Sequence, residues 1–280
     1  MTGSRQLTVN ADDFGWSRSV NRGIVEAHTD GIVTRTSVLA TGAAFDDAAE
    51  LAMATPSLGI GVHLNIYRGG TILPPERLPS LVGADGRLLG SWKEIVVRLA
   101  TGRFDLRQVE DELRAQIRFV KAAGLEPQHL DSEKHLHLWP GVFDVVCRLA
   151  VESGIPEVRT VREPPSVRPI PVGLGALSAR DATVVRAHGL LTADATIGVT
   201  RAPLDAAALD RILRTARGGS VEFVVHPGHV DDEFMQLQET VANRLVCSRE
   251  DELAALTGPD AHAAVERAGF RLALPGSGVQ

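Results

Sequence analysis

The chain has 280 residues, of which 44% are hydrophobic and 23% charged, and its formal net charge is -6. This composition is typical of a soluble globular protein, and the length suits one α/β barrel, so we predict a single domain over residues 1–280. No dense run of Lys or Arg interrupts the acidic balance, which argues against nucleic acid or an anionic membrane surface as a partner. A small-molecule substrate is therefore expected.

The N-terminal residues and the two cysteines bear on the cellular compartment. Residues 1–6 lack the apolar core of a signal peptide, and no later stretch approaches the roughly 18 apolar residues of a membrane span. We therefore expect a cytoplasmic protein. Cys147 and Cys247 lie in separate helical apolar patterns, which predicts two buried thiols and neither a disulfide nor a zinc site. The oligomeric state is open, and a homodimer is compatible with the sequence.

Strand and helix patterns alternate along most of the chain, which predicts an α/β fold of the TIM-like (β/α) barrel type. Strands are predicted near residues 7–9, 32–40, 58–65, 129–131, 157–161, 221–226 and 270–274. Amphipathic helices are predicted near residues 17–31, 43–54, 109–124, 142–153, 205–218 and over much of the remainder to 268. Residues 66–105 lose periodicity and predict an irregular loop or lid, and residues 164–175 predict a second loop.

The first strand runs directly into two adjacent carboxylates, Asp12 and Asp13, and then into a turn at Phe14 and Gly15. An extended chain sends neighbouring side chains to opposite faces, but a turn at this point can bring both carboxylates to one site. One could then bind a metal while the other acts as a base. The alternative is that the pair caps the following helix.

The strand over residues 58–65 alternates strictly, with His63 and Asn65 on the same face as Gly59 and Gly61. Glycine weakens a strand and usually marks the close approach of another group. This face therefore resembles the inside of a site, with His63 either a metal ligand or a structural residue.

Residues 127–140 hold the second chemical cluster. His129 and Asp131 alternate on a short strand and so share a face, while Glu133, His135 and His137 follow as the chain leaves the sheet. Such a set can supply metal ligands and the groups that hydrogen-bond to them. The alternative is a structural network of histidines and carboxylates.

The strand over residues 221–226 again finishes in an ionisable group, His226. Four strand ends thus carry such groups, and barrel enzymes gather their active sites at this rim, which favours a metal site over four independent structural features. Oxygen and imidazole ligands suit Zn²⁺, Mn²⁺ or Mg²⁺. Arg159 could hold a carboxylate, but we expect it to face solvent.

Four motifs carry a resemblance to the YdjC-like carbohydrate deacetylases, a family that includes chitooligosaccharide and hopanoid-associated types. They are Asn10-Ala11-Asp12-Asp13-Phe14-Gly15, Gly61-Val62-His63-Leu64-Asn65, His129-Leu130-Asp131-Ser132 and His226-Pro227-Gly228. The resemblance covers nearly the whole chain. It implies a distorted TIM-like barrel of about seven strands and removal of an N-acetyl group from an amino sugar.

The resemblance also implies roles for individual residues. Asp13 and His63 would bind one divalent metal ion, Asp12 would be the general base, and His226 would protonate the leaving amine. The family pattern has a metal-binding histidine directly after the Asp-Ser pair, where this chain has Glu133. We favour Glu133 as the third ligand, with His135 as the alternative, and the added negative charge should favour a harder cation.

Other polar and aromatic residues near these motifs are expected to contact substrate or to support the ligands: Asn65, His129, Asp131, His137 and Trp139. Two further functions remain open. One is a metallohydrolase acting on another amide or an ester. The other is a sugar-binding protein without catalysis, which the presence of both Asp12 and His226 argues against, because binding alone needs neither a base nor an acid.

Overall fold

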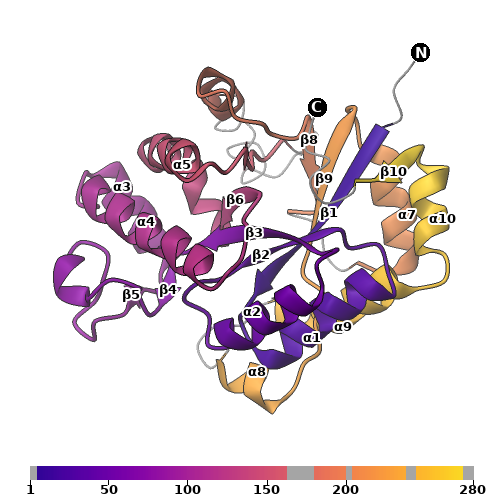
Figure 1. Ribbon diagram of the computed structural model, residues 1–280, viewed down its shortest axis with the longest axis horizontal. Helices are drawn as coiled ribbons and strands as arrows, with labels where there is room; N and C mark the ends of the chain where they lie inside the picture. Colours follow the sequence, from indigo (N-terminus) through magenta and orange to yellow (C-terminus); the bar gives the residue numbers. More distant parts are fainter. Residues whose placement is uncertain (1–4, 163–179, 200–203, 238–243, 274–280) are drawn as a thin grey trace.

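A curled parallel sheet organises the computed structural model, and helices lie around it (Figure 1). The structure describes residues 5–162, 180–199, 204–237 and 244–273. The strand order is β7-β6-β3-β2-β1-β9-β8, and β10 also pairs with β1. The strands are β1 (Arg5–Phe14), β2 (Arg35–Val38), β3 (Gly59–Leu64), β6 (His129–Ser132), β7 (Glu157–Val158), β8 (Ala195–Ile197), β9 (Ser220–Val225) and β10 (Phe270–Leu272).

The predicted α/β class is confirmed, whereas closure of the sheet into a full barrel stays a prediction. Within the described ranges no strand ladder joins β7 to β8, the two ends of the strand order. The ends are nonetheless linked, because Leu191 forms a parallel bridge with Glu157 and the hydroxyl of Thr196 donates to the carbonyl of Thr160. The sheet therefore curls far enough for each edge strand to contact a residue next to the other: Glu157 of β7 contacts Leu191, and Thr196 of β8 contacts Thr160.

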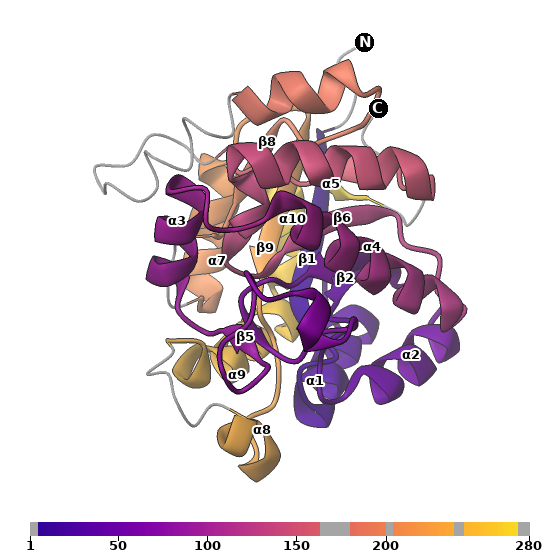
Figure 2. The same cartoon turned by 90° about the vertical axis from the view of Figure 1, so that its left-hand side faces the viewer.

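Helices cover the outer side of the curled sheet (Figures 1 and 2). They are α1 (Arg18–Thr29), α2 (Phe45–Ala54), α3 (Trp92–Ala100), α4 (Leu106–Ala122), α5 (Pro140–Ser153), α7 (Ala206–Thr215), α8 (Asp232–Leu237), α9 (Arg244–Thr257) and α10 (Ala261–Arg267). Helix α1 begins as predicted, because the side chain of Ser17 accepts a hydrogen bond from the amide of Val20. Helix α5 ends at Gly154, which has the left-handed conformation common at this position.

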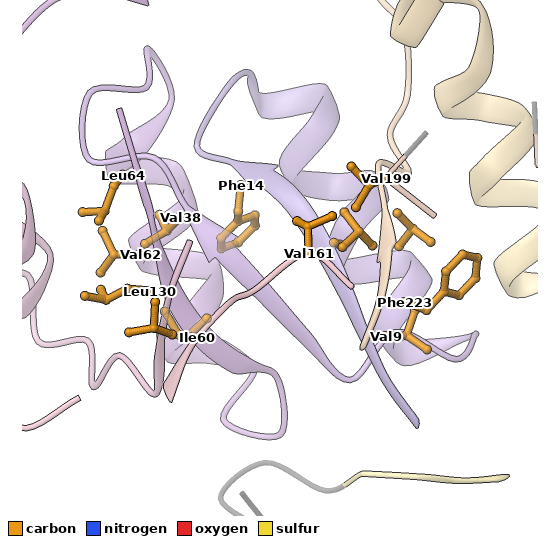
Figure 3. Close-up of a cluster of buried hydrophobic side chains, with 14 of the residues drawn as sticks. Val9, Phe14, Val38, Ile60, Val62, Leu64, Leu130, Val161, Val199 and Phe223 are labelled. Carbon is orange, nitrogen blue, oxygen red and sulfur yellow. The ribbon is translucent and has the colours of Figure 1, made fainter. Parts of the chain in front are cut away.

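The core lies between the strands and these helices. Figure 3 shows buried side chains from β1, β2, β3, β6 and β9, among them Val9, Val38, Val62, Leu130 and Phe223. Because side chains alternate along a strand, the polar residues that neighbour these apolar residues in sequence point to the opposite face of the sheet. The same alternation that builds the core therefore concentrates polar groups on the inner face of the sheet.

Four segments differ from the sequence-based picture or lie outside it. Residues 66–105 are not wholly irregular, since they contain the two-stranded sheet of β4 (Arg68–Gly69) and β5 (Leu88–Leu89), a 3₁₀ turn at Pro75–Arg77, and α3, which Ser91 caps. Strand β8 and the helical residues 180–187 were not predicted. The predicted loop at 164–175 lies outside the described residues.

Two compartment-related features can be examined directly. No helix in the described ranges combines the length and apolar character needed to cross a membrane. Cys147 is buried and free, as predicted. The side chain of Cys247 lies outside the described part of the chain.

Candidate active site

The two carboxylates at the end of β1 are brought together by an irregularity inside the strand. The pairing of β1 with β2 shifts register between Ala11 and Phe14, and Asp13 has a φ of 74°. A non-glycine residue rarely adopts this left-handed conformation, and such residues concentrate at functional sites. Asp12 and Asp13 are both buried. The predicted convergence is thus present, although it arises at Asp13 rather than in the turn that follows.

Asp12 is held by three side-chain hydrogen bonds. Arg159 donates to both carboxylate oxygens, at 2.9 and 3.0 Å, and the amide of Asn10 donates to Oδ1 at 2.7 Å. The expectation that Arg159 faces solvent is wrong. Its guanidinium is fully buried and also pairs with Asp131 at 2.7 Å and Glu222 at 2.9 Å. A buried arginine needs such partners, and three carboxylates supply them.

His63 lies between two carboxylates. Its Nδ1 atom is 2.7 Å from Oδ1 of Asp131, and its Nε2 atom is 3.7 Å from Oδ1 of Asp13. Burial by itself lowers the pKa of His63, but the charges of Asp131, Asp12 and Asp13 outweigh it and raise that pKa to about 9. A histidine that bonds a carboxylate through one nitrogen has the other nitrogen free to bind a metal.

Asp13 has a cationic partner of its own, Arg249 from α9. The guanidinium of Arg249 donates to Oδ2 of Asp13 and also to the backbone carbonyl of His226. Burial raises the pKa of Asp13, yet Arg249, His226 and His63 together bring it below its usual range. Asp13 is therefore ionised, and its Oδ1 atom is the one nearer to His63.

Glu133 is buried at the beginning of a strained turn that follows β6. The next two residues, Lys134 and His135, both have left-handed φ values, of 55° and 53°. Nε of Arg68 lies 2.6 Å from Oε1 of Glu133, but the N–H is not aligned for a hydrogen bond, and neither carboxylate oxygen has a hydrogen-bond partner in the described structure. Burial raises the pKa of Glu133, against the effect of Arg68.

His129 and His137 are structural neighbours of the site. The His129 ring fills the space beside Gly61, where a Cβ atom would overlap it, so this ring explains the glycine at position 61 of β3. His137 contacts the hydroxyl of Ser132 at 2.6 Å and the carbonyl of Arg159 at 3.0 Å. These contacts tie the turn after β6 to the segment that carries Arg159.

The remaining candidates are placed as follows. Asn65 is buried and accepts hydrogen bonds from the amides of Tyr67 and Arg68. The Nδ1 atom of His135 is buried without a partner in the described residues, and burial lowers its pKa well below the usual value. Trp139 is half-buried at the beginning of α5. Asn65 thus supports the loop after β3 rather than pointing to a ligand through a free donor.

His226 follows β9 and lies near Asp12, with 4.0 Å between Nε2 and the Oδ2 atom of Asp12. Its backbone amide donates to Glu252 at 2.6 Å. Burial lowers the pKa of His226 below its usual value, so the ring is neutral at pH 7.

Two sets of residues are candidates for holding a metal ion. Among the described residues, Asp12, His63 and Asp131 offer ligand atoms that all lie within 4.8 Å of one another. The ligand oxygens of this set are already engaged, because Asp12 accepts hydrogen bonds from Arg159, while Asp131 is hydrogen-bonded to His63 and forms an ion pair with Arg159. Asp13, His63 and Glu133 do not form such a compact group among the described residues, but Nε2 of His63 lies 3.7 Å from Oδ1 of Asp13, and both oxygens of Glu133 are without hydrogen-bond partners there.

Sequence reasoning missed five charged residues around the site. Arg35 pairs with Glu157 at 2.8 Å and with Glu222 at 3.0 Å, and together with Arg159 these side chains form a buried ionic layer. Arg68 and Arg249 complete the set of arginines. One signal was available, since Arg35, Glu157 and Glu222 are charged residues within buried strands, where a charge needs a partner.

Comparisons with known proteins agree with this geometry. A family model described as YdjC-like protein matches residues 6–267. A chitooligosaccharide deacetylase of Klebsiella pneumoniae subsp. pneumoniae is 35% identical over 270 residues, which are 96% of this chain and 97% of that protein. The chitooligosaccharide deacetylase of Salmonella paratyphi C is also 35% identical, over 98% of both chains.

A solved structure is similar over almost the same extent. It is a candidate cellobiose-phosphate cleavage protein from Enterococcus faecalis V583, with a TM-score of 0.77, 27% identity and 97% coverage of both chains. The match of sequence and of fold over nearly the full length leads to one conclusion: the chain belongs to the YdjC-like protein family.

Proposed function

We propose that this protein is a metal-dependent carbohydrate deacetylase that removes an N-acetyl group from an amino sugar. The observation that carries the proposal is the full-length similarity to two chitooligosaccharide deacetylases, at 35% identity. The chemistry of the site supports it. Two carboxylate–imidazole pairs, Asp13 with His63 and Asp12 with His226, lie at one end of the sheet. A metallohydrolase needs metal ligands and an acid–base pair of this kind.

Asp13, His63 and Glu133 are the residues that would hold one divalent ion, Zn²⁺, Mg²⁺ or Mn²⁺. The 3.7 Å between Nε2 of His63 and Oδ1 of Asp13 suits two ligands of one ion, and both oxygens of Glu133 are buried without hydrogen bonds in the described structure. Such an ion polarises an acetyl carbonyl and lowers the pKa of a water molecule. Asp131, bonded to Nδ1 of His63, fixes the ring so that Nε2 serves as the ligand.

Asp12 is the proposed general base. Arg159 and Asn10 fix its carboxylate by three hydrogen bonds, so it need not reorganise when it takes a proton from the attacking water. Both Asp12 and the proposed ligand Asp13 come from the end of β1, so the proposed base is adjacent to a proposed metal ligand.

His226 is the proposed proton donor to the leaving amine. Its ring is neutral at pH 7, so the proton must reach it during the reaction. The nearest acceptor of the water's proton is Asp12, at 4.0 Å from Nε2. This distance exceeds a direct hydrogen bond and requires either one bridging water or a small side-chain movement for the transfer.

The test is acetate release from N-acetylglucosamine, its short β-1,4-linked oligomers and acetyl esters, with the purified protein stripped by a chelator and then supplied with Zn²⁺, Mg²⁺ or Mn²⁺. The proposal expects acetate from the N-acetyl sugars, loss of activity on stripping, and recovery with at least one ion. Asp210→Asn, a change of an acidic residue at the surface ion pair with Arg214, is the matched control. Release from esters alone would favour a different hydrolase, and no release with any ion would overturn the proposal.

A further inference from the structure

Arg68 and Glu133 form a close ion pair for which the proposed reaction has no role. Glu133 stands where the family pattern has a neutral histidine, so the ligand set carries one more negative charge than that pattern. Arg68 lies directly beside this additional charge, with 2.6 Å between Nε and Oε1. Both side chains are largely buried, at 17% and 5% exposure, so water screens their interaction only partly.

Arg68 is held in this place by aromatic side chains. Its guanidinium lies 3.9 Å from the ring centroid of Trp16 and 5.5 Å from that of Tyr67. Stacking of this kind stabilises a cation and limits the freedom of its planar group. These stacking contacts therefore hold the Arg68 guanidinium beside Glu133.

The backbone of Arg68 is fixed as well. The side chain of Asn65 accepts from the Arg68 amide and donates to the Arg68 carbonyl, at 3.3 and 2.8 Å. Asn65 is in turn bound through its own backbone to Gln116 of α4, and Gln116 donates to Glu112. The oxygens of Glu112 accept from the amides of Ile72 and Leu73, so α4 clamps both ends of the loop that carries Arg68.

We propose that Arg68 is the charge-compensating residue of the metal site: by pairing with Glu133 it offsets the charge that this glutamate adds and lowers the affinity for divalent ions. The inference rests on the proposed function for the ligand role of Glu133. Asp13 has an equivalent partner in Arg249. In the described structure, each of the two proposed anionic ligands pairs with one arginine, Glu133 with Arg68 and Asp13 with Arg249.

The direction of the effect follows from Coulomb's law. A positive charge beside a ligand of a divalent ion repels the ion, and the partial burial of Arg68 and Glu133 leaves this repulsion only partly screened. Even a small repulsion energy changes binding measurably, since each 1.4 kcal/mol is a factor of about ten. Removing the Arg68 charge should therefore tighten metal binding, whereas damage to the fold would weaken it.

The first test measures the dissociation constants of the stripped protein for Zn²⁺ and Mg²⁺ by competition with a chromophoric chelator. Arg68→Gln should bind at least about 10-fold more tightly than the unaltered protein, and Arg68→Lys, which keeps the charge, within about 3-fold of it. Arg77→Gln is the matched control, because Arg77 lies in the same segment, residues 66–105, and its side chain is 60% exposed. Unchanged or weaker binding by Arg68→Gln would overturn the inference.

The second test exchanges the ligand. Glu133→His alone leaves Arg68 without its carboxylate, so it should bind metal more weakly than the unaltered protein even though it restores the residue of the family pattern. Adding Arg68→Gln to Glu133→His should recover at least about 10-fold of that affinity. Equal affinities of the single and double variants would contradict compensation. If the unaltered protein binds no metal, the proposed function itself fails. If it binds metal with an affinity that Arg68→Gln leaves unchanged, only the inference about Arg68 fails.

Discussion

Oδ1 of Asp131 lies 2.7 Å from Nδ1 of His63, inside a network in which neither side chain is exposed by more than 3%. The contact joins neighbouring strands, because His63 of β3 pairs in register with Asp131 of β6. When the ring is neutral, as metal binding requires, the contact keeps the remaining proton on Nδ1, and it leaves Nε2 on the side of Asp13. The strand register therefore determines the orientation of a proposed metal ligand.

Asp131→Asn tests this relationship. The amide can still occupy the space, but it lacks the charge that stabilises the His63 N–H, so metal affinity should fall by about 10- to 100-fold. Chelator competition measures the affinity, and thermal unfolding shows whether the variant is folded. Metal affinity equal to that of the unaltered protein, in a folded variant, would remove Asp131 from a supporting role.

Asp12→Asn separates the proposed base from the proposed ligands. The variant should keep its metal, because Asp12 is not in the ligand set, while kcat for acetate release should fall by about 10²- to 10⁴-fold. Asp13→Ala, the neighbouring change, should instead lose the ion. Metal content by mass spectrometry and turnover are measured on the same samples. Normal turnover in Asp12→Asn would remove the base assignment.

Arg159→Met tests the buried ionic layer beneath the site. Arg159 binds Asp12, Asp131 and Glu222, so its loss leaves three buried carboxylates short of a partner. The free energy of unfolding should fall by about 3–5 kcal/mol. Arg118→Met is the control, since Arg118 is 72% exposed and forms a surface ion pair with Glu152, and it should cost less than about 1 kcal/mol. Similar losses in the two variants in urea titrations would refute the interpretation.

The sequence predicted the elements that carry strong periodicity. Ser17 and Gly154 mark the ends of helices as expected, and the alternation around His63 identified β3 and its polar face. The bulge at Asp13 could not be predicted, because the left-handed conformation there depends on pairing with β2, a contact between residues far apart in the chain. Local patterns do not encode such long-range constraints.

The ion pairs show the same limit. The sequence predicts a solvent-facing Arg159, because arginine is rarely buried. The three carboxylates around it become neighbours only in the folded chain. Arg68 pairs with Glu133, and Arg249 pairs with Asp13. The two arginines are 181 positions apart in the chain. A single sequence contains no record of which charges will become neighbours.

Gly61→Ala tests the explanation of the glycine-rich strand. A Cβ atom at Gly61 would overlap the His129 ring, which is fully buried and has little room to move. The substitution should destabilise the protein by about 2 kcal/mol or more. Gly70→Ala, where nothing lies within 4 Å of the added atom, should change stability by less than about 0.5 kcal/mol. If both changes are equally tolerated in urea unfolding, the close approach of His129 does not explain Gly61.

Asp181→Asn tests the effect of a buried carboxyl group away from the site. Asp181 lies at the helical residues 180–187 with its Oδ2 atom unpartnered in the described structure, and burial raises its pKa to about 7, with Asp144 adding to the effect and Arg180 opposing it. Between about pH 4 and 7 the folded protein therefore holds a proton that the unfolded chain has released. This contribution to stability is complete below that window and is lost as pH rises through it.

The asparagine variant does not titrate at this position, so its advantage over the unaltered protein should grow with pH. We expect the difference in unfolding free energy to increase by about 1–2 kcal/mol between pH 4.5 and 7.5, less than the full shift implies, because relaxation and water penetration around a buried charge reduce its desolvation cost. Urea unfolding at a series of pH values measures it. Asp144→Asn, at a 43% exposed position, is the control and should show a smaller pH dependence. Parallel curves for Asp181→Asn and the unaltered protein would mean that Asp181 ionises normally in the folded state.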